Sequence, residues 1–86
     1  MSRAERIRTV LEARFQPTAL EVIDESGLHA GHAGARAEGQ THYRVRMTSA
    51  AFTGRPAVAR HRAVNAALAP EFETGLHALA LELSPP

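Results

Sequence analysis

Histidine is the residue type best suited to chemistry in this chain, because it occurs five times in 86 residues while cysteine is absent. His29 and His32 lie three residues apart in a glycine- and alanine-rich segment, residues 28–35. Neutral imidazole is the commonest protein ligand for borderline metals, and it titrates near physiological pH. Since this segment offers few side chains for a core, we expect a loop whose imidazoles bind a metal or a metal cluster.

The other three histidines fall in segments that favour regular structure. His77 follows Gly75 at the start of a predicted strand, where a side chain can be exposed at the end of a sheet, so it is the third candidate ligand. His42 lies in a predicted strand, and His61 precedes Val64 by three residues on the apolar side of a predicted helix. We expect His42 and His61 to be hydrogen-bonded structural histidines.

Each candidate ligand has an ordinary structural alternative. The pair His29 and His32 can be two unrelated histidines on a solvated loop, because an HxxH spacing away from a helix is a weak signal. Two loop histidines can also bind Zn²⁺ adventitiously. His77 can be a structural histidine that is hydrogen-bonded to neighbouring backbone.

Length and composition favour one small binding domain over an enzyme. A chain of 86 residues forms a single domain, residues 1–86, with a modest core and no room for an elaborate catalytic cleft. The sequence Asp24-Glu25-Ser26, which contains a hydroxyl and two carboxylates, is more typical of a strand end and turn than of a nucleophile with its base. We therefore expect no enzymatic activity, and we expect a monomer when the chain is alone.

The charge pattern and the N-terminus bear on partners and location. The net charge is +1, and every basic residue is arginine, a usage that suits anion recognition but is also typical of GC-rich genomes. The absence of cysteine excludes disulfides and favours a reducing compartment. Since the sequence opens on an amphipathic segment and contains no apolar run long enough for a bilayer, we expect no membrane association and a cytoplasmic location.

The first half of the chain predicts a helix, a strand and a long loop. Ser2 and Glu5 have the spacing of a capping box, and the following apolar residues recur at helical spacing until Pro17. Residues 20–24 are apolar and β-branched, which is typical of a short strand. The glycine and alanine content of residues 25–40 predicts a long loop, and loops of that length in compact domains are usually functional or disordered.

The second half predicts a strand, a helix and a final strand. Residues 41–48 alternate, with apolar side chains on one face and Arg44 and Arg46 on the other, as in a half-buried strand. A turn over residues 52–56 leads into a helix over residues 57–68, in which Val64 and Leu68 face inward and which Pro70 terminates. A short turn over residues 71–74 precedes a strand over residues 76–83, with three leucines on one face: Leu79, Leu81 and Leu83.

The resulting order of helix, strand, strand, helix and strand is α+β. Five short motifs within this order have the sequence and spacing of the BolA family, which the chain resembles from about Ile7 to Leu83. The motifs are Asp24-Glu25-Ser26, Thr41-His42-Tyr43-Arg44-Val45, Phe52-Thr53-Gly54, Arg60-His61-Arg62-Ala63-Val64 and His77-Ala78-Leu79-Ala80-Leu81. Each motif is weak alone, but five in register are specific.

The resemblance implies a fold similar to a class II KH domain, a three-stranded sheet with helices on one face. It also implies a monothiol glutaredoxin as partner, with a shared [2Fe–2S] cluster that serves iron–sulfur cluster maturation or iron sensing. In that family one cluster ligand is the histidine that opens the last strand, which His77 matches, and the second comes from the loop between the first two strands. His29 matches the loop position, and His32 is a second candidate because the loop looks longer than usual. The glutaredoxin cysteine and a glutathione thiol would complete the four ligands.

Nucleic-acid binding is the alternative, because bacterial members of the same family are described as DNA-binding regulators. Arg55, Arg60 and Arg62 lie on or before the second predicted helix and, with the two strand arginines, are available for phosphate contacts. The competing interpretation is a solvated surface with local ion pairs. A KH domain binds nucleic acid through a GxxG loop between helices, whereas the only GxxG here, residues 31–34, lies between strands.

Overall fold

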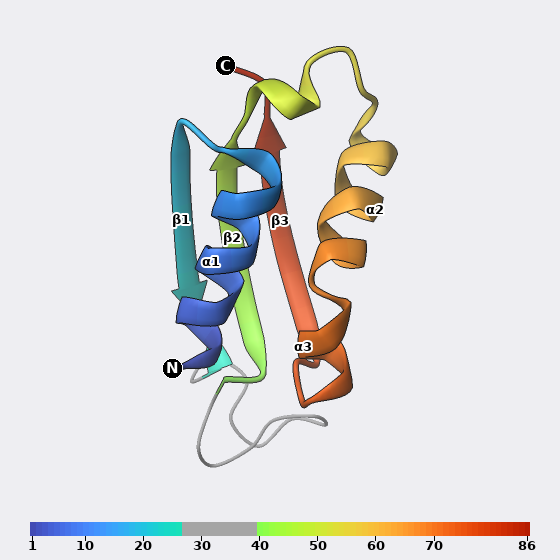
Figure 1. Ribbon diagram of the computed structural model, residues 1–86. Coiled ribbons are helices and arrows are strands. Elements are labelled where there is room, and N and C mark those ends of the chain that lie inside the picture. The colour runs from blue at the N-terminus through green and yellow to red at the C-terminus, as the bar shows by residue number, and fades with distance from the viewer. Residues whose placement is uncertain (27–39) are drawn as a thin grey trace.

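In a computed structural model, which describes residues 1–26 and 40–86, the helices cover one face of a three-stranded sheet (Figure 1). The class II KH-like α+β arrangement predicted from the sequence is therefore confirmed. The elements are α1 (Arg3–Phe15), β1 (Ala19–Asp24), β2 (His42–Thr48), the 3-10 turn η2 (Ala50–Phe52), α2 (Ala57–Ala67), α3 (Ala69–Glu73) and β3 (Ala78–Ser84).

Helix α1 begins and ends as its sequence predicts. The Glu5 N–H donates to Ser2 Oγ, and the Ser2 N–H donates to Glu5 Oε1, each at 3.2 Å, which completes the capping box. The helix ends at Phe15, and its C-cap residue Gln16 adopts a left-handed φ of 45° directly before Pro17. Between these caps, Ile7 and Leu11 lie one turn apart and are fully buried against the sheet.

Strand β2 is the centre of the sheet. It pairs antiparallel with β1 and parallel with β3, so the strand order is β1-β2-β3. Parallel pairing requires a crossover connection, which here runs through α2 and α3. The alternation predicted for β2 is confirmed: Tyr43, Val45 and Met47 are buried beneath the helices, whereas Arg44 and Arg46 lie on the opposite, open face.

The second helical region differs from the expectation in two places. Pro70 ends α2 as predicted but also opens a further helix, α3, where the sequence indicated only a turn, because proline fits the first turn of a helix. The last strand begins at Ala78, two residues later than expected. Leu76 is instead buried in the core, after Gly75 with a φ of 126°.

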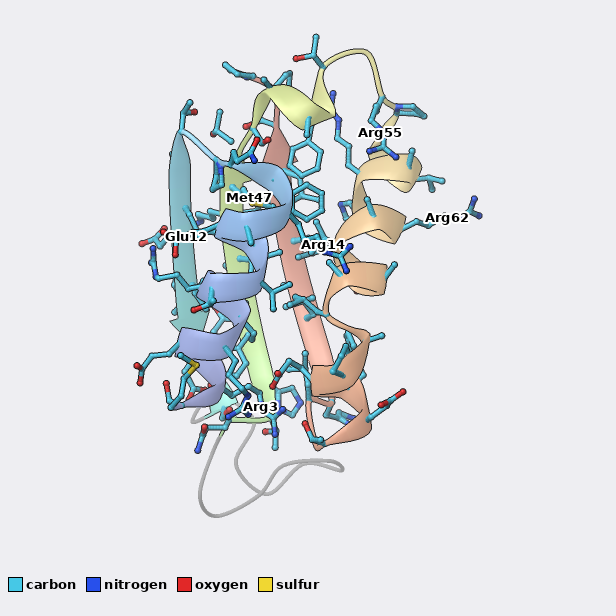
Figure 2. The ribbon with its side chains drawn as sticks, viewed as in Figure 1. Arg3, Glu12, Arg14, Met47, Arg55 and Arg62 are labelled. Carbon is cyan, nitrogen blue, oxygen red and sulfur yellow. The ribbon has the colours of Figure 1, made fainter. Side chains whose placement is uncertain are left out.

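A buried ion cluster, which the sequence analysis missed, joins the start of α1 to α3. Arg3 Nη1 lies 2.7 Å from Glu71 Oε1, and Arg6 Nε lies 3.0 Å from Glu71 Oε2. Arg3 also donates to Thr74 Oγ1 at 3.0 Å and to the Thr74 carbonyl at 2.9 Å. Its backbone N–H donates to Gln40 Oε1 at 3.0 Å. Arg3 therefore connects the two chain segments that lead into β2 and β3, at the end of the molecule where Figure 2 labels it.

Candidate metal-binding site

His77 lies at the end of the sheet, directly before β3, with its side chain exposed. Its N–H donates to the Thr41 carbonyl at 2.8 Å, and the Ala78 N–H donates to the same oxygen at 3.1 Å. Buried Leu76 holds the chain on the other side of His77. The prediction of an exposed histidine at the sheet end is confirmed, although His77 precedes the strand instead of opening it.

Ser26 fastens the end of β1 to the start of β2. Its Oγ accepts the N–H groups of Thr41 at 2.9 Å and His42 at 3.1 Å, while its own N–H donates to Asp24 Oδ1 at 2.9 Å. Ser26 and Thr41 are both buried. Residues 26 and 41 are thus adjacent, and Thr41 is also the residue that binds the backbone of His77. The Asp24-Glu25-Ser26 motif forms the base of this site.

The loop candidates His29 and His32, and the GxxG at residues 31–34, lie outside the described residues. Their role as ligands therefore stays a prediction. Among the described residues, the Thr41 carbonyl accepts the N–H of His77, and the Thr41 N–H donates to Ser26 Oγ. Within residues 1–26 and 40–86, no three histidine, aspartate or glutamate side chains come together as a metal site.

His42, the first residue of β2, is 6% exposed, and its Nδ1 lies 2.8 Å from Thr41 Oγ1. The expectation of a hydrogen-bonded histidine is therefore confirmed. The sequence analysis missed a second feature: the His42 ring centre lies 5.3 Å from that of His77, with the ring planes at 53°. Parallel pairing of β2 with β3 places His42 opposite Ala78 and so brings the two imidazoles together.

The inward orientation expected for His61 is wrong, because its side chain is exposed. The buried side of α2 is made by Val64, Ala67 and Leu68. Arg60, four residues before Val64, lies on this side instead and reaches the Leu83 carbonyl at 3.4 Å. At 100° per residue, His61 falls at the edge of the stripe formed by Val64, Ala67 and Leu68, where it faces solvent, while Arg60 lies nearer the centre of the stripe.

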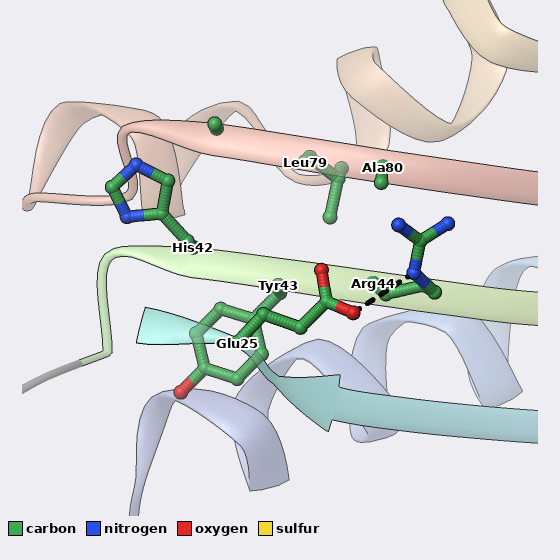
Figure 3. Close-up of a pocket in the computed structure, with 7 residues that line it drawn as sticks. Glu25, His42, Tyr43, Arg44, Leu79 and Ala80 are labelled. Carbon is green, nitrogen blue, oxygen red and sulfur yellow. Dashed lines mark hydrogen bonds and ion pairs between the residues drawn. The ribbon is translucent and has the colours of Figure 1, made fainter. Parts of the chain in front are cut away.

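A shallow hollow of about 230 Å³ lies on the open face of the sheet beside His42. Figure 3 shows His42 at one end of this hollow and the ion pair of Glu25 with Arg44 further along the strands. Ala78 and Ala80 line it from β3, and their small side chains leave the space open.

Beyond the hollow, the open face carries a ladder of ion pairs. Arg44 contacts Glu25 at 3.0 Å and Glu82 at 2.9 Å, while Arg46 contacts Glu82 at 3.2 Å and Glu21 at 3.1 Å. Hydrogen bonds from Arg44 and then Arg46 lower the pKa of Glu82, and bonds to Glu25 and then Glu82 raise the pKa of Arg44. The interpretation of the strand arginines as a solvated face with local ion pairs is therefore confirmed.

The three arginines proposed for nucleic-acid contacts differ in their surroundings. Arg60 is half-buried, and its Nε donates to the Arg55 carbonyl at 2.8 Å, so part of its guanidinium serves the fold. Arg55 and Arg62 are exposed (Figure 2). They flank the first turn of α2, which contains no acidic side chain and no side-chain cap. Of the three, Arg55 and Arg62 are the exposed ones, and a role in phosphate contacts stays a prediction.

Comparisons with known proteins identify the family to which this chain and its fold belong. The family model described as BolA-like protein matches residues 11–86. The chain belongs to the BolA-like family. Over its whole length it superimposes on 94% of the BolA domain of SufE1 from Arabidopsis thaliana, with a TM-score of 0.90 and 43% sequence identity.

Three relatives show the range of proteins that this BolA-like chain resembles. A Sinorhizobium protein described only as an uncharacterized protein in the cobS 5′ region is 51% identical over 100% of this chain and 94% of the relative. The DNA-binding transcriptional regulator BolA of Escherichia coli is 46% identical over 90% of this chain and 70% of its own length. SufE-like protein 1 of Arabidopsis thaliana is 44% identical over 99% of this chain, which spans only 24% of that longer protein.

Among the helices that the structure describes, none has the length and apolar character needed to cross a membrane.

Proposed function

We propose that this BolA-like chain is a non-enzymatic partner of a monothiol glutaredoxin and shares a [2Fe–2S] cluster with it, in cluster maturation, trafficking or iron regulation. The observation that carries the proposal is the exposed imidazole of His77, whose backbone is fixed at the sheet end by Thr41. The histidine motif at the start of β3 is also where the family resemblance assigns a cluster ligand.

The residues present suit a shared cluster and not a resident one. The chain contains no cysteine, so any thiolate ligand must come from the partner, as a glutaredoxin cysteine and its bound glutathione would provide. His77 supplies one imidazole, and His29, or His32 in its place, is the expected second ligand. Neutral histidine ligands in place of thiolates raise the reduction potential of a [2Fe–2S] centre.

The test is a titration of the purified chain into [2Fe–2S]-loaded monothiol glutaredoxin, followed by visible circular dichroism and size-exclusion chromatography. The proposal expects a heterodimer with a spectrum unlike that of the glutaredoxin homodimer. His77→Ala and one of the two loop variants, His29→Ala or His32→Ala, should weaken that spectrum. His61→Ala is the matched control because its side chain is exposed on α2. An unchanged spectrum with no complex would count against the proposal.

DNA-binding regulation is the second candidate. Arg55 and Arg62 are exposed around a helix start that contains no acidic side chain in its first turn, and the E. coli relative is named as a DNA-binding regulator. Duplex binding should weaken steeply with salt, and replacing either arginine by alanine should reduce the slope of log K against log salt by about 1. Arg46→Ala is the control, because that side chain is already paired with Glu21 and Glu82.

A further inference from the structure

Strand β1 forms one margin of the sheet and pairs with β2 on its inner side (Figure 1). The N–H of Glu25, directly after β1, donates to a carbonyl of β2, and in a regular antiparallel ladder every second residue bonds the same neighbour. The backbone groups of Leu20, Val22 and Asp24 therefore point away from the sheet. In agreement, the Leu20 carbonyl accepts from Arg8 Nη2 of α1 at 3.4 Å. This outer row of donors and acceptors is what a further strand binds.

The side chains of β1 determine how a second copy of the chain can pair with this margin. In an antiparallel pair with its two-fold axis at Val22, Glu21 lies opposite Ile23 of the second copy. Moving the axis by one residue sets Glu21 opposite either Glu21 or Glu25 of the second copy, and like charges directly opposite each other destabilise a strand pair. The axis at Val22 avoids both contacts and is therefore the favoured pairing.

The same pairing brings Arg8 of each copy to Asp24 of the other. Leu20 then lies opposite Asp24 of the second copy, whose N–H binds the carbonyl that Arg8 already contacts. Because Asp24 pairs with buried Tyr43 in the sheet, its carboxylate lies on the face that α1 covers, within reach of the Arg8 guanidinium. One oxygen of this carboxylate accepts the Ser26 N–H at 2.9 Å, and a carboxylate has acceptor sites for both donors. The two-fold axis repeats the ion pair, so the charges are matched twice.

The two margins of the sheet differ in what lies next to them. In Figure 1, α2 lies beyond β3, whereas α1 lies over β1 and β2 and no helix of the described residues lies beyond β1. We propose that β1 pairs with β1 of a second copy, antiparallel around Val22, to form one continuous sheet. A pair of six-residue strands is smaller than a standard interface of about 1,600 Å², so the dimer is weak and the monomer expected from the sequence is the state of the dilute chain. The proposal goes beyond the proposed function, because it involves neither His77 nor a glutaredoxin.

The experiment is sedimentation velocity of the full chain from about 10 µM to about 1 mM, where weak interfaces associate. We expect a monomer–dimer equilibrium that weakens as salt rises, because Arg8 and Asp24 are exposed. Arg8→Glu should raise the dissociation constant about tenfold, and the charge swap Arg8→Glu/Asp24→Arg should restore it. Arg14→Glu is the matched control, because it makes the same charge change on the side of α1 that faces α2 (Figure 2) and should leave the dimer unchanged.

Because Asp24 also accepts the Ser26 N–H, the swapped variant is first checked for folding by far-ultraviolet circular dichroism. Nitrogen-15 NMR of the wild-type chain is an independent measurement. The amides of Leu20 and Val22 should shift with protein concentration, and more than that of Glu21, which is directed toward β2. The proposal is overturned if the sedimentation coefficient stays constant up to about 1 mM. It is also overturned if the concentration-dependent shifts lie on another surface, or if the folded swap variant dimerises no better than Arg8→Glu.

Discussion

Replacing Glu71 tests how much the ion pairs between α1 and α3 stabilise the fold next to the candidate site. Its side chain is 9% exposed and lies between Arg3, whose side chain is 10% exposed, and Arg6, which is 40% exposed. Glu71→Ala would leave the Arg3 guanidinium buried without its counter-ion. Removing one partner of a buried ion pair typically costs about 3–5 kcal/mol.

We therefore expect Glu71→Ala to lower the free energy of unfolding by about 3 kcal/mol. This value is at the lower end of the range because Arg6 is partly solvated and Arg3 keeps its hydrogen bonds to Thr74. For a domain of this size, that corresponds to a fall in Tm of about 12–24 °C. Urea unfolding followed by circular dichroism gives the free energy, and a thermal scan gives the Tm.

Two companion variants make this reasoning refutable. Glu82→Ala removes a carboxylate that is also paired with two arginines but is 49% exposed, so it should destabilise the fold much less than Glu71→Ala does. The double variant Arg3→Met/Glu71→Met removes both members of the buried pair and should be less destabilised than Glu71→Ala, because no uncompensated charge remains at Arg3. If Glu71→Ala and Glu82→Ala cost the same, the argument from burial fails.

Two further predictions concern the open face and the base of the site. Hydrogen bonds from Arg44 and Arg46 lower the pKa of Glu82 in the folded chain, so its contribution to stability is present above the ordinary glutamate pKa and is lost as the pH falls through the lowered value. Carbon-13 NMR should show this carboxyl titrating below an ordinary glutamate, and an ordinary midpoint would contradict the ion-pair ladder. Ser26→Ala should cost about 1–3 kcal/mol, because it leaves the buried N–H of Thr41 and its neighbour without their acceptor. Hydrogen exchange at these two amides should accelerate, and unchanged protection would contradict the role of Ser26 Oγ as their acceptor.

The sequence predicts best those parts of the fold that are set by neighbouring residues. The capping box of Ser2 and Glu5 and the alternation of β2 are local patterns, and both are confirmed. The contact between Arg3 and Glu71 spans 68 positions, and no local pattern indicates it. The sequence predicts Glu71 in a turn, because Pro70 indicates the end of one helix. In the structure Pro70 also lies in the first turn of the next helix, α3.

In the candidate site too, local patterns predict some features, whereas others depend on how the strands pair. The motif at His77 was sufficient to predict an exposed imidazole at a sheet end. Its neighbour His42 was correctly expected to be hydrogen-bonded, but its distance from His77 depends on which strands pair and in which direction. His61 was placed wrongly because an apolar residue three positions later suggests a shared face, whereas Arg60 occupies the edge of that face.

The two candidate functions use opposite ends of the molecule. His77, Ser26 and Thr41 gather where β2 and β3 begin, near α3, whereas Arg55 lies where α2 begins, at the far end of the sheet (Figures 1 and 2). A protein bound at the His77 end would therefore leave the start of α2 uncovered, and the two activities need not compete for one surface. It follows that His77→Ala should weaken the glutaredoxin-dependent spectrum without changing duplex binding, and Arg55→Ala should weaken duplex binding without changing the spectrum. If one substitution impaired both the cluster spectrum and duplex binding, a single shared surface would explain the result better than two separate surfaces.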